Sequence, residues 1–164
     1  MISIRSKNSY GFALIEIMIC CAILSAVTIA LLSYAQKGLE LSNQSLRQTQ
    51  AAYLLEEGAE AVKTFRDDNW TNISSLSLDT NYYFAYDTTS GTWSLSQTPN
   101  IINGIFKRIV VFSAVARDSN DDIVASGGTT DTDAKKVTIT TSWVSADGSA
   151  SSKTLTFYIF NIFS

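Results

Sequence analysis

The chain begins with a short polar segment, continues with a long apolar stretch, and changes to an extended pattern only near residue 70. From Phe12 to Leu32 the only strongly polar side chain is Glu16. A helix rises about 1.5 Å per residue, so this stretch spans roughly 30 Å, the thickness of a bilayer's hydrocarbon core. The pattern therefore predicts a membrane-spanning helix with one carboxylate near its start.

The helical pattern continues beyond Leu32, because no proline and no turn cluster interrupts it before Asn69. At about 100° per residue, this second half carries two apolar stripes on nearly opposite faces. The first stripe is Ala35, Leu39, Leu46 and Tyr53, and we expect it to meet neighbouring subunits. The second is Ala51, Leu55, Ala59, Val62 and Phe65, and we expect it to lie on the chain's own sheet. A group of charged residues should face away from the second stripe: Glu56, Glu57, Glu60, Lys63 and Asp67. Asn69 is a candidate left-handed cap.

From Trp70 onward the pattern predicts β-strands. The expected strands are residues 82–86, 92–96, 106–116, 123–126, 137–144 and 155–163. Residues 137–144 alternate, with Val137, Ile139, Thr141 and Trp143 on one face, and residues 127–133 read as a polar loop. A turn at residues 146–149 predicts a hairpin, and the short connections favour an antiparallel meander. The expected fold is α+β, a long N-terminal helix packed on a C-terminal antiparallel β-sheet.

The carboxylate of Glu16 needs an explanation, since an ionised group near a bilayer's core costs roughly 2.5–3.5 kcal/mol. Glu16 either lies close enough to the membrane surface to reach water, as in a signal anchor, or is paired with a positive charge. Cleavage after Gly11 would give Phe12 an α-ammonium inside the apolar segment. The two charges could then cancel within one helix or between neighbouring subunits.

Residues Gly11-Phe12-Ala13-Leu14-Ile15-Glu16 resemble the cleavage and methylation motif of type IV pilins and type II secretion pseudopilins. That family usually shows Gly-Phe-Thr-Leu-Ile-Glu, and this chain departs from it at Ala13. The short leader with Arg5 and Lys7 also fits. The resemblance implies that a prepilin peptidase cuts between Gly11 and Phe12 and methylates the Phe12 amine, and that Glu16 neutralises the ammonium of an adjacent subunit. It implies three further partners, namely other pilin or pseudopilin subunits, a membrane assembly platform, and the lipid bilayer before assembly.

These features divide the chain into a leader (1–11), a transmembrane and assembly half of the helix (12–34), an amphipathic half (35–69) and an exported antiparallel β domain (70–164). The expected location is the cytoplasmic (inner) membrane, with a single pass, and then a cell-surface or periplasmic filament. Residues 51–63, with Arg66, Asp67 and Trp70, resemble minor pilins and minor pseudopilins. The exported part has no cysteine and so no disulfide, which points the same way.

Composition excludes several function classes. The chain has no histidine, which removes His-based triads and His metal sites, and it has no Gly-rich phosphate loop. With 12 basic and 15 acidic residues and no basic patch, the sequence lacks the cluster of positive charge that is typical of nucleic-acid binding. Cys20 and Cys21 are interpreted as small apolar helix residues rather than a redox pair or an acylation site. No cofactor is expected.

One acidic loop is a weak calcium candidate, because hard oxygen ligands suit that ion. Its residues are Asp118, Asn120, Asp121 and Asp122. Their spacing is not that of an EF-hand, and an acidic hairpin turn is more often only solvated.

The sequence thus predicts a structural subunit of a type IV pilus or type II secretion pseudopilus, without catalytic activity. The alternative is an uncleaved single-pass membrane protein with an exported β-rich binding domain. A soluble protein secreted after cleavage near residues 25–30 is a lesser alternative. Processing after Gly11 separates the first two.

Overall fold

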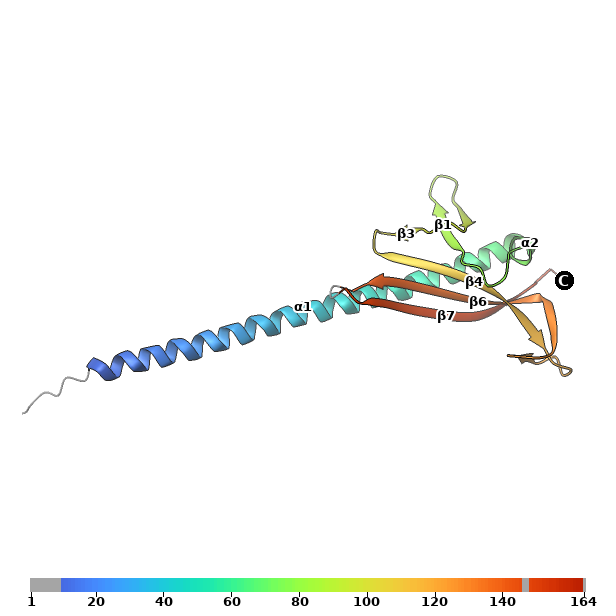
Figure 1. Ribbon diagram of the computed structural model, residues 1–164. Coiled ribbons are helices and arrows are strands. Elements are labelled where there is room, and N and C mark those ends of the chain that lie inside the picture. Colours follow the sequence, from blue (N-terminus) through green and yellow to red (C-terminus); the bar gives the residue numbers. More distant parts are fainter. Residues whose placement is uncertain (1–9, 146–147, 164) are drawn as a thin grey trace, which may run out of the picture. The chain divides into compact units, whose positions relative to one another are not determined.

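The computed structural model of the 164-residue chain describes residues 10–145 and 148–163, with side chains from Ala13 onward (Figure 1). Most of the expected leader and the Ala146-Asp147 part of the expected turn lie outside these residues. Contacts divide the chain into two units, with the boundary between Asn43 and Gln44.

The first unit is the start of helix α1 (Tyr10–Asp68). By length and composition this helix is able to cross a membrane. Its side chains from Ala13 to Leu39 are exposed in the isolated chain. Three hydroxyls donate hydrogen bonds to the carbonyl four residues earlier: Ser25 to Cys21 at 2.7 Å, Thr28 to Leu24 at 2.8 Å, and Ser33 to Ile29 at 2.9 Å. These polar groups are therefore satisfied within the helix, as hydrocarbon surroundings require.

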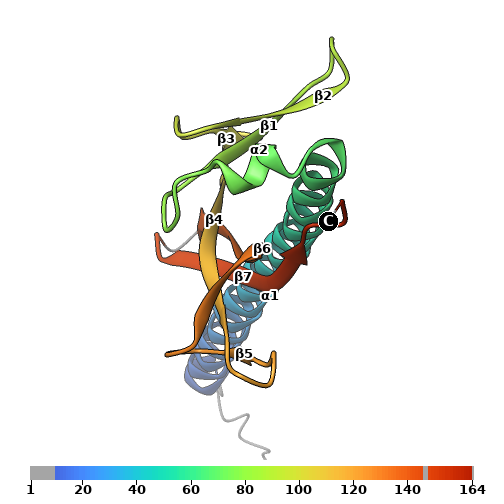
Figure 2. The same cartoon turned by 90° about the vertical axis from the view of Figure 1, so that its right-hand side faces the viewer.

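The second unit contains the rest of α1 and all of the β-structure. A five-stranded antiparallel sheet has the order β3-β4-β6-β7, with β5 paired to β4. Its strands are β3 (Ile101–Ile102), β4 (Phe106–Arg117), β5 (Ile123–Val124), β6 (Thr129–Val144) and β7 (Ala150–Phe160). A separate hairpin consists of β1 (Tyr83–Asp87) and β2 (Thr92–Ser96). A short helix, α2 (Thr71–Ser74), connects α1 to this hairpin (Figure 2).

The second apolar stripe of α1 faces the core, as predicted. Ala51, Leu55, Ala59 and Val62 are buried. Phe65 packs against the cluster that contains Leu55, Ala59 and Val62, while Ala51 lies in a second cluster with Phe106 and Trp143. The sheet contributes the expected face of β6, since Val137, Ile139, Thr141 and Trp143 are all buried. The first stripe stays outside, with Leu46 56% and Tyr53 66% exposed.

The structure corrects three details. The expected polar loop at residues 127–133 is wrong beyond Gly128, because β6 already begins at Thr129 and pairs with the end of β4 across a register shift at Ala114/Val115. The single meander is wrong, because β1 and β2 form a sheet of their own, linked to β4 by a bridge between Tyr82 and Val110. Asn69 is not left-handed; its side-chain oxygen instead accepts a hydrogen bond from the amide of Thr71, which leads into α2.

Helix α1 approaches the sheet closely at Gly58. A Cβ atom at this position would lie 3.1 Å from Cδ of Arg108 and 3.3 Å from two atoms of Ile139. Glycine thus weakens the helix by about 1 kcal/mol but allows this contact. The backbone of α1 can therefore pack directly against side chains of the sheet.

Arg108 lies inside this contact although it is charged, and only 3% of it is exposed. Its Nη1 donates to the Leu54 carbonyl of α1 at 3.0 Å and lies 3.4 Å from the Glu57 carboxylate. Its guanidinium also stacks 5.5 Å from the centre of the Trp93 ring in β2. Glu57 was expected to face away from the core, and it is half exposed, yet its carboxylate turns back to Arg108. Burial lowers the pKa of Arg108, and Glu57 opposes that shift.

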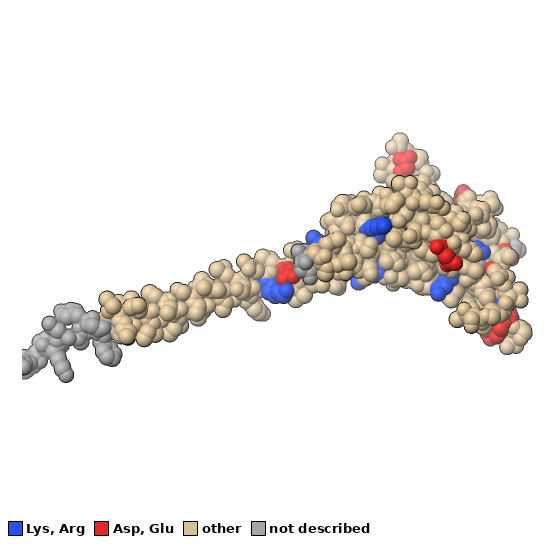
Figure 3. Space-filling model, viewed as in Figure 1, with Lys and Arg blue, Asp and Glu red and all other residues tan. Residues whose placement is uncertain are grey.

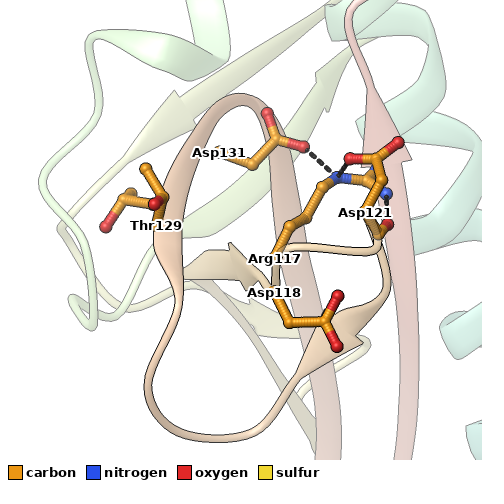
Figure 4. Close-up of a pocket in the computed structure, with 6 residues that line it drawn as sticks. Arg117, Asp118, Asp121, Thr129 and Asp131 are labelled. Atoms are coloured by element: carbon orange, nitrogen blue, oxygen red, sulfur yellow. Dashed lines mark hydrogen bonds and ion pairs between the residues drawn. The ribbon is translucent and has the colours of Figure 1, made fainter.

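A second charged contact joins the C-terminal end of β4 to the N-terminal part of β6. Arg117 Nε donates to a carboxylate oxygen of Asp131 at 2.6 Å, and its Nη1 donates to the Asp121 carbonyl at 2.8 Å (Figure 4). This hydrogen bond from Arg117 holds the pKa of Asp131 below its ordinary value. Beside it, Gly128 has a φ of +81°, and a Cβ there would clash with the Arg117 carbonyl oxygen. Only glycine fits this turn into β6.

Gly58→Leu should destabilise the full chain in detergent micelles by about 1–3 kcal/mol, because the new side chain overpacks Arg108 and Ile139. Gly38→Leu is the matched control, since nothing lies within 4 Å of a Cβ at Gly38 and leucine favours helix over glycine. The measurement is thermal unfolding followed by near-UV circular dichroism. Equal midpoints for the two variants would contradict the close approach of α1 to the sheet.

The Arg117–Asp131 contact should depend on pH. Because the folded-state pKa of Asp131 is lowered, its contribution to stability is present above the unfolded value of about 3.9 and is lost as pH falls through the lower folded value. The difference in unfolding midpoint between wild type and Asp131→Asn should therefore be largest above about pH 5 and shrink below about pH 4. Asp122→Asn serves as the control, and a pH-independent difference for Asp131→Asn would refute the ion pair.

Candidate functional site: the processing motif

The motif lies at the start of α1. Helical backbone begins at Tyr10, so the peptide bond between Gly11 and Phe12 belongs to its first turn. Glu16 follows Phe12 by four residues, about one helical turn or 6 Å along the axis. A helix places residues i and i+4 on the same face, so Glu16 shares a face with the Phe12 position.

The side chains between them are apolar and open. Ala13, Leu14 and Ile15 are all exposed. In the isolated chain, the described side chains that follow the Gly11–Phe12 bond are therefore accessible to solvent.

Glu16 has no cationic side chain near it along the described helix. The first Lys or Arg after residue 13 is Lys37, and its ammonium is 2.8 Å from Glu40. On the face shown in Figure 3, the apolar start of α1 carries no charged patch, whereas Lys, Arg, Asp and Glu gather on the second unit. Between residues 13 and 36, the described helix therefore offers Glu16 no cationic side chain.

The calcium candidate lies in the turn between β4 and β5. One oxygen of Asp118 accepts hydrogen bonds from the amides of Asn120 at 2.8 Å and Asp122 at 3.0 Å. The Asp121 carboxylate lies 3.6 Å from Nε of Arg117, so a cation already occupies its surroundings (Figure 4). The described residues contain no group of three or more His, Cys, Asp or Glu placed to hold a metal ion. The calcium site stays a prediction from sequence.

Cys20 and Cys21 lie in the same apolar part of α1. Both are free thiols and exposed in the isolated chain.

Sequence reasoning missed Arg108 as a structural cation. A signal was available, because Arg108 alternates with Phe106, Val110 and Phe112, which point into the core. The period of two along β4 places its side chain on that buried face.

Comparison with family models matches residues 6–32 to the prokaryotic N-terminal methylation motif. No curated protein and no solved structure matches the chain. The match covers the motif and the apolar half of the helix but not the β-structure.

The prokaryotic N-terminal methylation motif, at the head of a long apolar helix that continues onto an antiparallel sheet, supports the assignment of this chain to the type IV pilin and pseudopilin family.

Proposed function

We propose that the chain is a structural subunit of a type IV pilus or type II secretion pseudopilus. A prepilin peptidase cuts it between Gly11 and Phe12 and methylates the new amine, and the subunit polymerises through α1. It performs no catalysis itself. The observation that carries this proposal is Glu16, the one carboxylate in an apolar helix, four residues beyond the methylation motif's cleavage position.

Electrostatics explains the role that we propose for Glu16 and the Phe12 amine in assembly. A buried carboxylate and a buried ammonium are each unfavourable alone, and each removes much of the other's cost when they meet. A helix that enters a bundle of apolar helices is therefore most stable at the register where its Glu16 contacts the Phe12 amine of a neighbour. Apolar contacts alone are non-directional, so they favour many registers almost equally.

The exposed first stripe supports the same proposal. Leu39, Leu46 and Tyr53 are exposed, while the opposite face of α1 is already covered by the sheet. Packing against other subunits would remove this apolar surface from water. The features that suggest a minor subunit, the 51–63 segment and the missing disulfide, come from the sequence.

We propose that the subunit occupies two locations in succession. It is first held in the cytoplasmic membrane by residues 12–34, with residues 70–164 exported, and it then enters a cell-surface or periplasmic filament through the assembly platform. The alternative is an uncleaved anchor that presents a β-rich binding domain. The sequence itself contains no basic patch that would favour a nucleic-acid partner.

Mass spectrometry of the N-terminal peptide from host membranes should find a chain that begins at N-methylated Phe12. Gly11→Val is the matched variant, and it should leave the leader attached because the peptidase no longer meets glycine before the bond. A wild-type chain that still begins at Met1 would instead establish the uncleaved anchor.

Glu16→Gln should lower incorporation into filaments at least about tenfold, since one half of a buried charge pair is lost. The unfolding midpoint of the second unit should not change, because Glu16 belongs to the first unit. Glu40→Gln, a glutamate of the same helix outside the apolar segment, should assemble normally. The measurement is the filament-bound fraction in sheared preparations; normal incorporation of Glu16→Gln would refute the pairing.

A further inference from the structure

The two edges of the five-stranded sheet differ. On one side, β4 is closed by the chain itself: Val110 and Tyr82 exchange two backbone hydrogen bonds of 2.9 Å, and the Asp79 amide donates to the Phe112 carbonyl at 2.8 Å. Strand β3 covers the start of β4. On the other side, β7 is the outermost strand (Figure 1).

The hydrogen bonds at both ends of β7 show which of its residues face outward. The Asn161 amide donates to the Asp133 carbonyl, and the Ser145 amide donates to the Ser149 carbonyl, both at 2.8 Å. In an antiparallel ladder these bonds alternate along the strand, so the odd-numbered residues of β7 face β6. The even-numbered residues direct their N–H and C=O groups away from the sheet, and all six are exposed: Ala150, Ser152, Thr154, Thr156, Tyr158 and Phe160. No backbone partner for these groups exists among the described residues.

Natural sheets usually protect such an edge with charges, proline, a bulge or a short strand. Strand β7 has none of these protections beyond one charge. It pairs with β6 over 11 residues without a register shift, it contains no proline, and Lys153 is its only charged residue. The edge is therefore long, regular and open.

We propose that the β7 edge binds an extended segment of another polypeptide, which adds to the sheet as a further strand. The outward N–H and C=O groups specify this occupant, because an extended main chain satisfies them at the spacing of alternate residues. The β7 edge belongs to the second unit, so the proposal does not depend on processing at Phe12. Only the choice of a foreign strand over a second copy rests on the membrane anchor of the proposed function.

The side chains beside the edge define the chemistry of the partner strand. On the outer face, Thr154 and Thr156 are followed by Tyr158 and Phe160, which are 42% and 41% exposed. On the helix side, Leu155 and Phe157 are only partly buried. A matching strand alternates small polar and β-branched apolar residues, and Lys153 favours one that is neutral or carries a single acidic residue.

A second copy of this chain is the competing occupant. Antiparallel pairing of two β7 edges, however, would point the second half of α1 in opposite directions in the two copies, since that part of α1 runs alongside β7 in the same direction (Figure 1). Such a dimer is unfavourable for two chains anchored in one membrane. A foreign strand meets no such restriction, because it can add in either direction.

The test uses the full chain in detergent micelles and two fluorescent synthetic peptides of alternating threonine and valine with one glutamate. In the one-edge peptide, every second amide is N-methylated, so one edge stays free to pair and the peptide cannot form sheets with itself. In the no-edge peptide, all amides are methylated. Fluorescence anisotropy should show binding of the one-edge peptide at least about tenfold tighter than of the no-edge peptide.

Variants of the β7 edge provide a second test of the proposal. Thr156→Pro removes an outward N–H that bonds nothing within the described chain, and it should weaken binding of the one-edge peptide about tenfold. Thr156→Ala keeps the main chain and should bind within about threefold of wild type. Equal binding of the two peptides by the wild-type chain would overturn the proposal whether or not Thr156→Pro folds. A wild-type dimer that Thr156→Pro converts to monomer would replace the foreign strand with a second copy and overturn the partner assignment.

Discussion

The close contact between α1 and the sheet at Gly58 is the constraint on which the second unit depends. Because glycine has no side chain, the helix backbone lies directly over Arg108 and Ile139. This contact fixes the rotation of the helix about its axis. Ala51, Leu55, Ala59 and Val62 are turned into the core, and the face with Leu46 and Tyr53 is turned out. The packing that closes the core thus also decides which surface remains for other proteins.

Arg108 shows how a charge can serve such a contact. Its guanidinium donates to a carbonyl of α1, lies near Glu57 and stacks on Trp93 of the β1–β2 hairpin. One side chain of β4 thus links the helix, the main sheet and the hairpin. Removing a cation from water is unfavourable unless partners replace the water, and here the partners come from α1 and from the β1–β2 hairpin. Its Nε has no hydrogen-bond partner among the described residues, which is consistent with the lowered pKa.

Most of the fold could be predicted because its periods are regular. The 3.6-residue period of residues 51–65 predicts one apolar face of the helix, and the alternation of residues 137–143 predicts one apolar face of the strand. Both predicted faces are buried in the structure. The start of β6 could not be predicted, because Thr129 to Asp133 carry no apolar alternation and are ordered by pairing with the end of β4 and by Arg117. The turn of Glu57 toward Arg108 was missed for a similar reason, since a residue on the polar face of a helix gives no local sign of a partner on a distant strand. The processing motif is purely local, so its residues could be identified from sequence.

The hydroxyls in the apolar part of α1 have a consequence for how that segment changes its surroundings. Ser25, Thr28 and Ser33 each donate a hydrogen bond to their own helix, so the hydroxyl hydrogens need no water molecule or lipid headgroup as an acceptor. Lipid chains and packed apolar helices are then nearly equivalent solvents for every group of this segment except Glu16. Transfer from one to the other changes little in solvation, and it needs neither dehydration of these groups nor remodelling of the helix. The same segment is therefore suited to leave a membrane and to return to it.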